Sequence, residues 1–269
     1  MGTLRATALA VGLSLAIPAG HLAAQIDYRN LDHERPVATE DAYPVERHAF
    51  ELLLPFRSER ERGGERQHLI PVEVEYGLFD NAQVGVGLPL GAVDALESDT
   101  EWGLGGLEVF GLYNFNTEGP ALPALSIRAD VSLPVGSLSS EHARVSLKGI
   151  ATRSWGLTRL HFNAGRSFGS EDEPGVEFAP RWSYSLALDR TLFRQSLLIV
   201  AELLAQRAVS GSPVEVNAGI GMRYQLSPTF VLDGGVARRL RSRVGPDYGL
   251  TIGLSHVFGL SWLMPGRAR

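Results

Sequence analysis

The sequence has no cysteine among its 269 residues. This absence excludes a disulfide scaffold, a cysteine zinc site, a thiol nucleophile and a lipidated N-terminal cysteine. There is also no excess of positive charge, because 25 Lys and Arg stand against 30 Asp and Glu, and this balance argues against a nucleic acid as partner. Mean hydropathy is close to zero, so hydropathy alone would assign a water-soluble protein.

Long apolar runs are missing too, apart from a short one near the N-terminus. Arg5 precedes the mostly apolar residues 8–17, Pro18-Ala19-Gly20 end this run, and Leu22-Ala23-Ala24 form a plausible small-residue cleavage site. A positive start, a short apolar centre and a small-residue end are typical of a secretory signal peptide, and the run is shorter than the about 20 residues of a spanning helix. We expect residues 1–24 to be a cleaved signal peptide, with an uncleaved anchor helix as the alternative.

The ends of the mature chain lack sustained periodicity. Residues 25–46 are polar and mixed in charge. We interpret them as a periplasmic N-terminal extension that lies on one side of the fold, and a plug in the lumen is the second possibility. Residues 259–269 form a short C-terminal tail, expected to turn back into the periplasm.

From Phe50 onward, apolar residues alternate with polar or small ones. Every second residue from Val214 to Tyr224 is apolar, for example, and the residues between them are polar or glycine. A period of two is typical of β-strands. Because strands in globular proteins average about 5–6 residues and membrane-spanning strands about 9–11, runs of this length favour a membrane barrel. The alternation predicts strands at 48–56, 67–78, 82–90, 104–116, 124–134, 143–155, 158–168, 181–192, 196–207, 213–226, 229–240 and 247–258.

The connections and the aromatic residues support the same fold. Tight turns such as Gly156-Leu157 alternate along the chain with longer, more charged connections such as 57–66, as in outer-membrane barrels. Aromatic residues on the apolar parity gather near strand ends, as in interfacial girdles. We predict an all-β fold, a transmembrane antiparallel up-and-down β-barrel of about twelve strands over residues 47–258, in the bacterial outer membrane. Its expected partners are outer-membrane lipid, lipopolysaccharide and, during insertion, the barrel-assembly machinery.

Charged residues on the opposite parity are the candidates for lining the lumen. Two interpretations remain open: a structural network of paired charges in a filled interior, or a channel with a mild preference for cations or neutral polar solutes. About eight strands make a filled barrel and sixteen an open one, so twelve predict a narrow or partly plugged passage. The candidates are Glu51, Glu73, Glu75, Glu108, Arg128, Asp130, Lys148, Asp189, Glu202, Glu215, Arg223, Asp233 and Arg239.

Enzyme chemistry has little support. The sequence contains no G-x-S-x-G motif, and no recognisable motif surrounds the candidate bases His48, His68, His142 and His161. His256 lies on the lipid-facing parity, which is a poor place for a catalytic base. We therefore predict no catalytic residues, no cofactor and no metal site. Passive transport or binding of a small organic solute is the preferred function, a non-conducting structural or surface-interaction barrel is the alternative, and a lipid-modifying enzyme is less favoured.

One hairpin carries a family resemblance. Within residues 71–89, the turn Tyr76-Gly77-Leu78-Phe79-Asp80 is followed by alternating glycines and by Leu88-Pro89. This segment resembles a recurring hairpin of the outer-membrane transporters of the phenol meta-degradation pathway type, and Gly105-Gly106-Leu107-Glu108 resembles their next strand after a small departure in phase. The resemblance implies transport of small organic compounds, and it identifies no binding residue.

Overall fold

The computed structural model describes residues 27–61, 63–94, 100–170, 179–192, 196–211, 213–241, 246–260 and 262–263. The predicted signal peptide and most of the predicted tail lie outside these residues.

No helix in the described residues is long and apolar enough to cross a bilayer.

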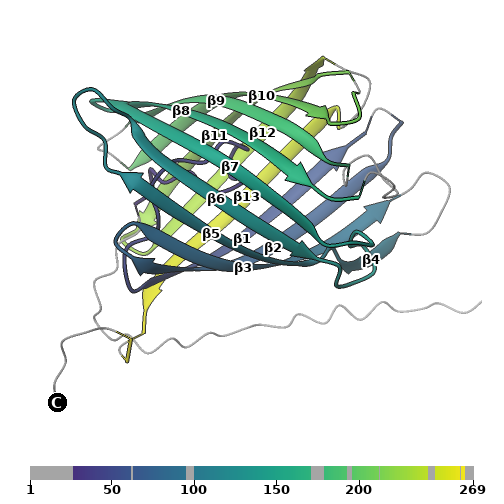
Figure 1. Cartoon of the computed structure of the whole chain (residues 1–269), viewed down its shortest axis with the longest axis horizontal. Coiled ribbons are helices and arrows are strands. Elements are labelled where there is room, and N and C mark those ends of the chain that lie inside the picture. Colours follow the sequence, from purple (N-terminus) through teal and green to yellow (C-terminus); the bar gives the residue numbers. More distant parts are fainter. Residues whose placement is uncertain are drawn as a thin grey trace, which may run out of the picture.

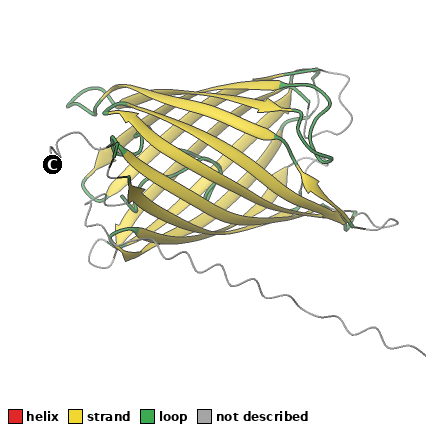
Figure 2. Cartoon of the chain, turned by 90° about the horizontal axis from the view of Figure 1, so that it is seen from below, coloured by secondary structure: helices red, strands yellow, loops and turns green. Residues whose placement is uncertain are grey.

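The described chain folds into one closed antiparallel barrel (Figures 1 and 2). Apart from β4 and β5, which both pair with β3, each strand pairs with its neighbours in sequence, and the first strand also pairs with the last, which closes the sheet. This arrangement confirms the predicted barrel. The strands are β1 (Ala49–Arg60), β2 (Arg66–Phe79), β3 (Ala82–Asp94), β4 (Glu101–Leu104), β5 (Leu107–Asn116), β6 (Ala124–Leu133), β7 (Arg144–Trp155), β8 (Thr158–Phe168), β9 (Arg181–Leu192), β10 (Leu197–Ala208), β11 (Glu215–Ser227), β12 (Phe230–Arg241) and β13 (Tyr248–Gly259).

Strands β4 and β5 occupy a single strand position in the barrel wall, so the thirteen strand segments form a twelve-stranded barrel. Both pair with β3: Leu104 faces Leu90, and Glu108 faces Gly87. Between these two pairs β3 has two residues and the facing chain has three, so the facing chain carries one extra residue. Gly106 has a φ of +135° there, and Pro89 on the facing strand has no N–H to donate. This β-bulge explains the departure in phase seen in the sequence, because one inserted residue reverses the faces.

The connections sort by length between the two ends of the barrel. The tight turns, such as 80–81 and 156–157, define the short-turn end, where β1 begins and β13 finishes. The connection predicted at 57–66 is shorter than expected, because β1 continues to Arg60 and β2 begins at Arg66. Arg57 therefore belongs to a strand and not to a solvated loop.

The outer face of the barrel is apolar and the inner face is polar. On β6, Leu125, Ile127 and Val131 are exposed by 39%, 41% and 37%, whereas Ser126 and Arg128 on the inner parity are buried. Alternate side chains thus face the lipid and the lumen, as membrane barrels require. The mean hydropathy is close to zero because it averages the apolar residues of the outer face with the polar residues of the inner face.

A ladder of rings crosses the seam where β1 meets β13, at the short-turn end. Tyr76 packs on Phe50 with ring centroids 4.6 Å apart, and Phe50 stacks on Phe258 at 5.5 Å. His256 continues the ladder to Phe230, 4.1 Å away. Cross-strand ring pairs stabilise a sheet, so this ladder strengthens the junction that closes the barrel.

Residues 27–48, called here the lumenal segment, lie inside the barrel. They form the purple trace within the strands in Figure 1. Tyr28, Leu31, Val37 and Val45 are buried there against small and aliphatic residues of the inner wall. The sequence allowed this part of the chain to lie beside the barrel or within its lumen, and the described residues lie within the lumen.

Candidate functional site

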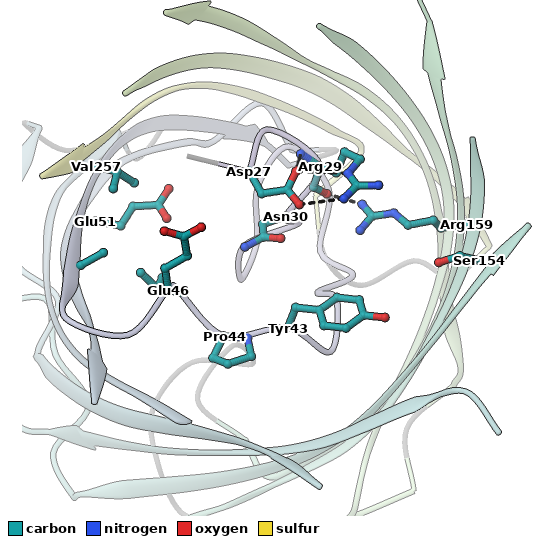
Figure 3. A pocket seen from close by; sticks show the side chains of 12 residues that line it. Asp27, Arg29, Asn30, Tyr43, Pro44, Glu46, Glu51, Ser154, Arg159 and Val257 are labelled. Atoms are coloured by element: carbon teal, nitrogen blue, oxygen red, sulfur yellow. Dashed lines mark hydrogen bonds and ion pairs between the residues drawn. The ribbon is translucent and has the colours of Figure 1, made fainter. Parts of the chain in front are cut away.

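Both ends of the lumenal segment lie at the short-turn end of the barrel. Asp27 and Glu46 line the same cavity there, about 280 Å³ in volume, with Arg159 and Val257 on the wall (Figure 3). The segment therefore enters and leaves at one mouth and reaches into the lumen between these two points. Farther along the lumen, its residue Glu34 pairs with Arg57 of β1.

The neck of this loop is closed by its own hydrogen bonds. The Asp41 N–H donates to the Leu31 carbonyl oxygen over 3.1 Å, and the Leu31 N–H donates to the Asp41 carboxylate over 3.2 Å. Residues 32–40, called here the tip loop, are thus a compact loop with adjoining ends.

Glu40 in the tip loop bridges two cations of the wall. Its carboxylate oxygens lie 3.0 Å from the Arg128 guanidinium and 3.0 Å from Lys148 Nζ. Burial raises the pKa of Glu40, but the positive charges of Arg128 and Lys148 outweigh burial and hold that pKa below its usual value. Glu40 is therefore an ionised anchor of the segment.

Asp41 makes a second anchor on the neighbouring part of the wall. Its carboxylate lies 3.1 Å from Arg159, which also binds Asp189 at 2.6 Å. His161 lies 2.9 Å from the same Asp189 carboxylate and 3.0 Å from the Thr152 hydroxyl. This hydroxyl–imidazole–carboxylate series is fully enclosed, and the Thr152 hydroxyl already accepts the Ala42 N–H over 3.0 Å. Its function in this state is to hold the segment.

A third anchor joins Asp32 and Arg35 of the segment to β11 and β12. Asp32 lies 2.9 Å from Arg223 and 2.6 Å from Arg35. Arg35 in turn lies 3.5 Å from Asp233 of β12. Carboxylate oxygens of Asp32, Glu51 and Glu75 lie within 4.8 Å of one another beside these arginines.

Polar side chains of the wall hold the main chain of the segment. The Glu40 N–H donates to the Asn163 side-chain oxygen over 2.8 Å, and the Asn163 amide donates back to the Glu40 carbonyl over 2.8 Å. The Asn114 amide donates to the Ala42 carbonyl over 2.8 Å. Glu202 accepts the N–H groups of Ala38 and Thr39. Specific donors and acceptors thus replace water around the buried backbone, which otherwise carries a large desolvation cost.

Two glycines on facing strands make room for Pro36. Gly221 and Gly235 are register partners on β11 and β12. A Cβ added at Gly221 would lie 2.8 Å from the Pro36 ring, and one added at Gly235 would overlap the Pro36 carbonyl oxygen. A side chain at Gly235 is therefore incompatible with the observed position of the segment.

Gly235→Ala is expected to displace the tip loop from its observed position against β11 and β12. Overpacking of this kind costs about 1–3 kcal/mol of folding free energy. Because movement of the lumenal segment would relieve this steric overlap and widen the path, the variant should show a higher ion conductance in planar bilayers. Gly249→Ala is the matched control, because a Cβ there meets only Ala237 at an ordinary 3.7 Å. Equal conductance of the two variants would show that the Gly235 notch does not position the segment.

The thirteen residues predicted from parity differ in their relation to the segment. Arg128, Lys148, Glu202, Arg223 and Asp233 contact it directly. Ten of the thirteen are buried, and the half-buried ones are Glu108, Asp130 and Lys148. The remaining predicted residues lie on the wall around these contacts or nearer the long-loop end, and they are Glu51, Glu73, Glu75, Glu108, Asp130, Asp189, Glu215 and Arg239.

Sequence reasoning missed two cations of the wall. Arg57 falls in the part of the first hairpin that was expected to be a loop. Arg159 shares the inward parity of His161 on β8, so the alternation already carried the signal that would have identified it. Each binds a carboxylate of the lumenal segment.

A second, smaller cavity lies on the far side of the tip loop, toward the long-loop end. Its volume is about 70 Å³. His33, Glu34 and Ala38 of the segment form one side, and the wall residues are Lys148, Asn163, Ser183, Ser185, Leu204 and Gln206. The tip loop thus stands between a large cavity at one end of the lumen and a small one nearer the other end.

The family profile described as "Putative MetA-pathway of phenol degradation" matches residues 65–249. The chain belongs to this family. A search of curated proteins gives no match. Family membership agrees with the resemblance of the hairpin at residues 71–89.

Solved outer-membrane channels share the fold of this family member. The COG4313 outer membrane channel from Pseudomonas putida F1 aligns with a TM-score of 0.63 at 15% identity, over 85% of this chain and 100% of that chain. The NanC porin aligns at 0.55 and 8% identity, over 77% and 98%. The KdgM porin, solved in complex with oligogalacturonate, aligns at 0.52 and 13% identity, over 77% and 99%. At these identities the likeness shows a common barrel, and the proteins concerned are channels and porins.

Proposed function

We propose that this protein is an outer-membrane channel that lets small organic solutes cross passively, and that the tip loop shifts during passage. The observation that carries the proposal is the pair of cavities on opposite sides of the tip loop, inside one closed barrel. The apolar outer face suits the hydrocarbon core of a bilayer, and the polar inner face suits a solute path. In this orientation the short-turn end faces the periplasm.

The comparisons support a small organic solute. The family description concerns phenol degradation, and two of the solved structures with the same fold are the COG4313 outer membrane channel and the NanC porin. We further propose that residues 1–24 direct export, that the barrel-assembly machinery inserts the chain, and that the long-loop end faces lipopolysaccharide. The predicted lumen residues would then border the solute path once the segment moves.

The second candidate is a non-conducting structural barrel. The three ionic anchors and the enclosed main chain of the lumenal segment favour it, because a firmly held segment fills the lumen. Such a barrel needs no movement of residues 27–48.

Planar-bilayer recording of the full chain separates the two candidates. A channel is expected to give stable but small current steps, because the tip loop narrows the path. Folding of each sample is checked by the shift in gel mobility on boiling. If folded wild-type protein and a variant lacking the tip loop both give no steps, the channel proposal is wrong and the filled barrel stands.

A further inference from the structure

Arg128 and Lys148 form a cation pair on the inner wall, and their two positive charges exceed the single negative charge of the wall residue Asp130, which binds Arg128. They are direct register partners on β6 and β7, and their side chains both reach Glu40 in the lumen. Like charges directly opposite each other on neighbouring strands are destabilising. In the observed state the Glu40 carboxylate removes this repulsion by placing one oxygen against each cation, at 3.0 Å and 3.0 Å.

The guanidinium of Arg128 is positioned by the wall and not by the lumenal segment. It stacks over the Phe110 ring with its central carbon 3.7 Å from the ring centroid. Its Nε donates to Asp130 over 2.7 Å, and Asp130 also accepts the Ser146 hydroxyl at 3.0 Å. None of these three partners belongs to residues 27–48. The terminal nitrogen that binds Glu40 therefore keeps its direction when the segment leaves.

Lys148 connects this cation pair to the smaller cavity. Lys148 lines the 70 Å³ space together with Ser183, Ser185 and the Asn163 amide. A solute arriving from the long-loop end thus meets Lys148 and neutral hydrogen-bonding groups of the wall before it meets Glu40, with His33 and Glu34 of the tip loop on the other side of the cavity. The His33 ring nitrogen Nδ1 lies 2.7 Å from Lys148 Nζ. A carboxylate is an especially good replacement for Glu40, because its two coplanar oxygens can take the same two donors.

We infer that the Arg128–Lys148 pair is a binding site for the carboxylate of a small organic acid, and that Glu40 occupies this site in place of the solute. Binding of the acid displaces Glu40 and loosens the tip loop. The inference rests on the proposed channel function, because it names the solute class for the same lumen. It concerns this cation pair alone, since acidic residues are numerous elsewhere on the wall.

Displacement of the tip loop can be followed with a single cysteine, because the chain has none of its own. Thr39→Cys replaces the side chain by one of similar size, and Thr39 is fully buried beside Glu40. The rate of maleimide labelling of this cysteine then reports how often the tip loop moves away from the wall and exposes residue 39. The probes are benzoate and benzamide, which have the same shape and differ in charge, with sodium chloride at equal ionic strength as the salt control.

Benzoate is expected to increase the labelling rate several-fold, and benzamide and sodium chloride are expected to leave it nearly unchanged. Lys148→Gln in the same background should remove the difference between benzoate and benzamide. Equal labelling rates with benzoate and benzamide in the Thr39→Cys protein that retains Lys148 would overturn the inference. This comparison does not depend on whether the Lys148→Gln variant folds.

The outcome is separable from that of the proposed function. Absence of current steps in planar bilayers would reject the channel but would leave benzoate-dependent labelling intact. Current steps together with equal labelling by the two probes would keep the channel and reject the carboxylate site.

Discussion

Removal of the tip loop, Asp32 to Glu40, is expected to raise single-channel conductance several-fold while the barrel stays closed. The deletion is geometrically simple, because the Asp41 N–H and the Leu31 carbonyl oxygen already lie 3.1 Å apart. It removes the carboxylates of Asp32, Glu34 and Glu40 from the lumen together with Arg35. It leaves every strand pairing in place, since each lies outside residues 32–40.

The control for this deletion is Glu46→Gln, which removes one charge from the exposed end of the lumenal segment and leaves the tip loop intact. Its conductance should match that of the wild type. Both variants must retain heat-modifiable mobility, so that conductance is compared between folded barrels. A folded deletion variant with unchanged conductance would mean that residues 32–40 do not limit the flow of ions.

Arg128→Met is expected to have the largest effect on stability among single substitutions in the lumen. The residue is 1% exposed, and its side chain binds both Glu40 and Asp130. Removing one partner of a buried ion pair costs about 3–5 kcal/mol, because the other partner stays buried without compensation. Urea unfolding in lipid vesicles should show a loss of this size.

The control is Arg47→Met, which breaks the exposed pair between Arg47 and Asp80. These side chains are 47% and 83% exposed and 3.6 Å apart. An exposed pair contributes about 0–1 kcal/mol, so the loss should be small. Similar losses for Arg47→Met and Arg128→Met would show that burial of the network does not determine its strength.

The barrel could be predicted because alternation is repeated along every strand. A period of two assigns each side chain to the lipid or the lumen without knowledge of its partners. The bounds of β8 and β9 agree with the predicted 158–168 and 181–192. The β-bulge at Gly105-Gly106 was visible only as a change of phase, because its position depends on Pro89 across the strand pair.

The contents of the lumen could be predicted only in part. Parity placed Arg128 and Lys148 inside, but nothing local connects them to Glu40, which lies 88 and 108 residues away in the sequence. The lumenal segment has no period because its partners come from strands all around the barrel. The sequence alone therefore allows two paths for this segment, beside the barrel or inside it, and the structure has it inside.

Locking the segment to the wall tests most directly whether it must move for passage. The hydroxyl oxygens of Thr39 and Ser185 lie 2.8 Å apart, so Thr39→Cys with Ser185→Cys should form a disulfide under oxidation in a chain that has no other cysteine. Single-channel current is expected to fall when the disulfide forms and to return when it is reduced, whereas oxidation and reduction should not change the current of either single-cysteine variant. Equal current in the oxidised and reduced states, with the cross-link complete, would contradict this expectation.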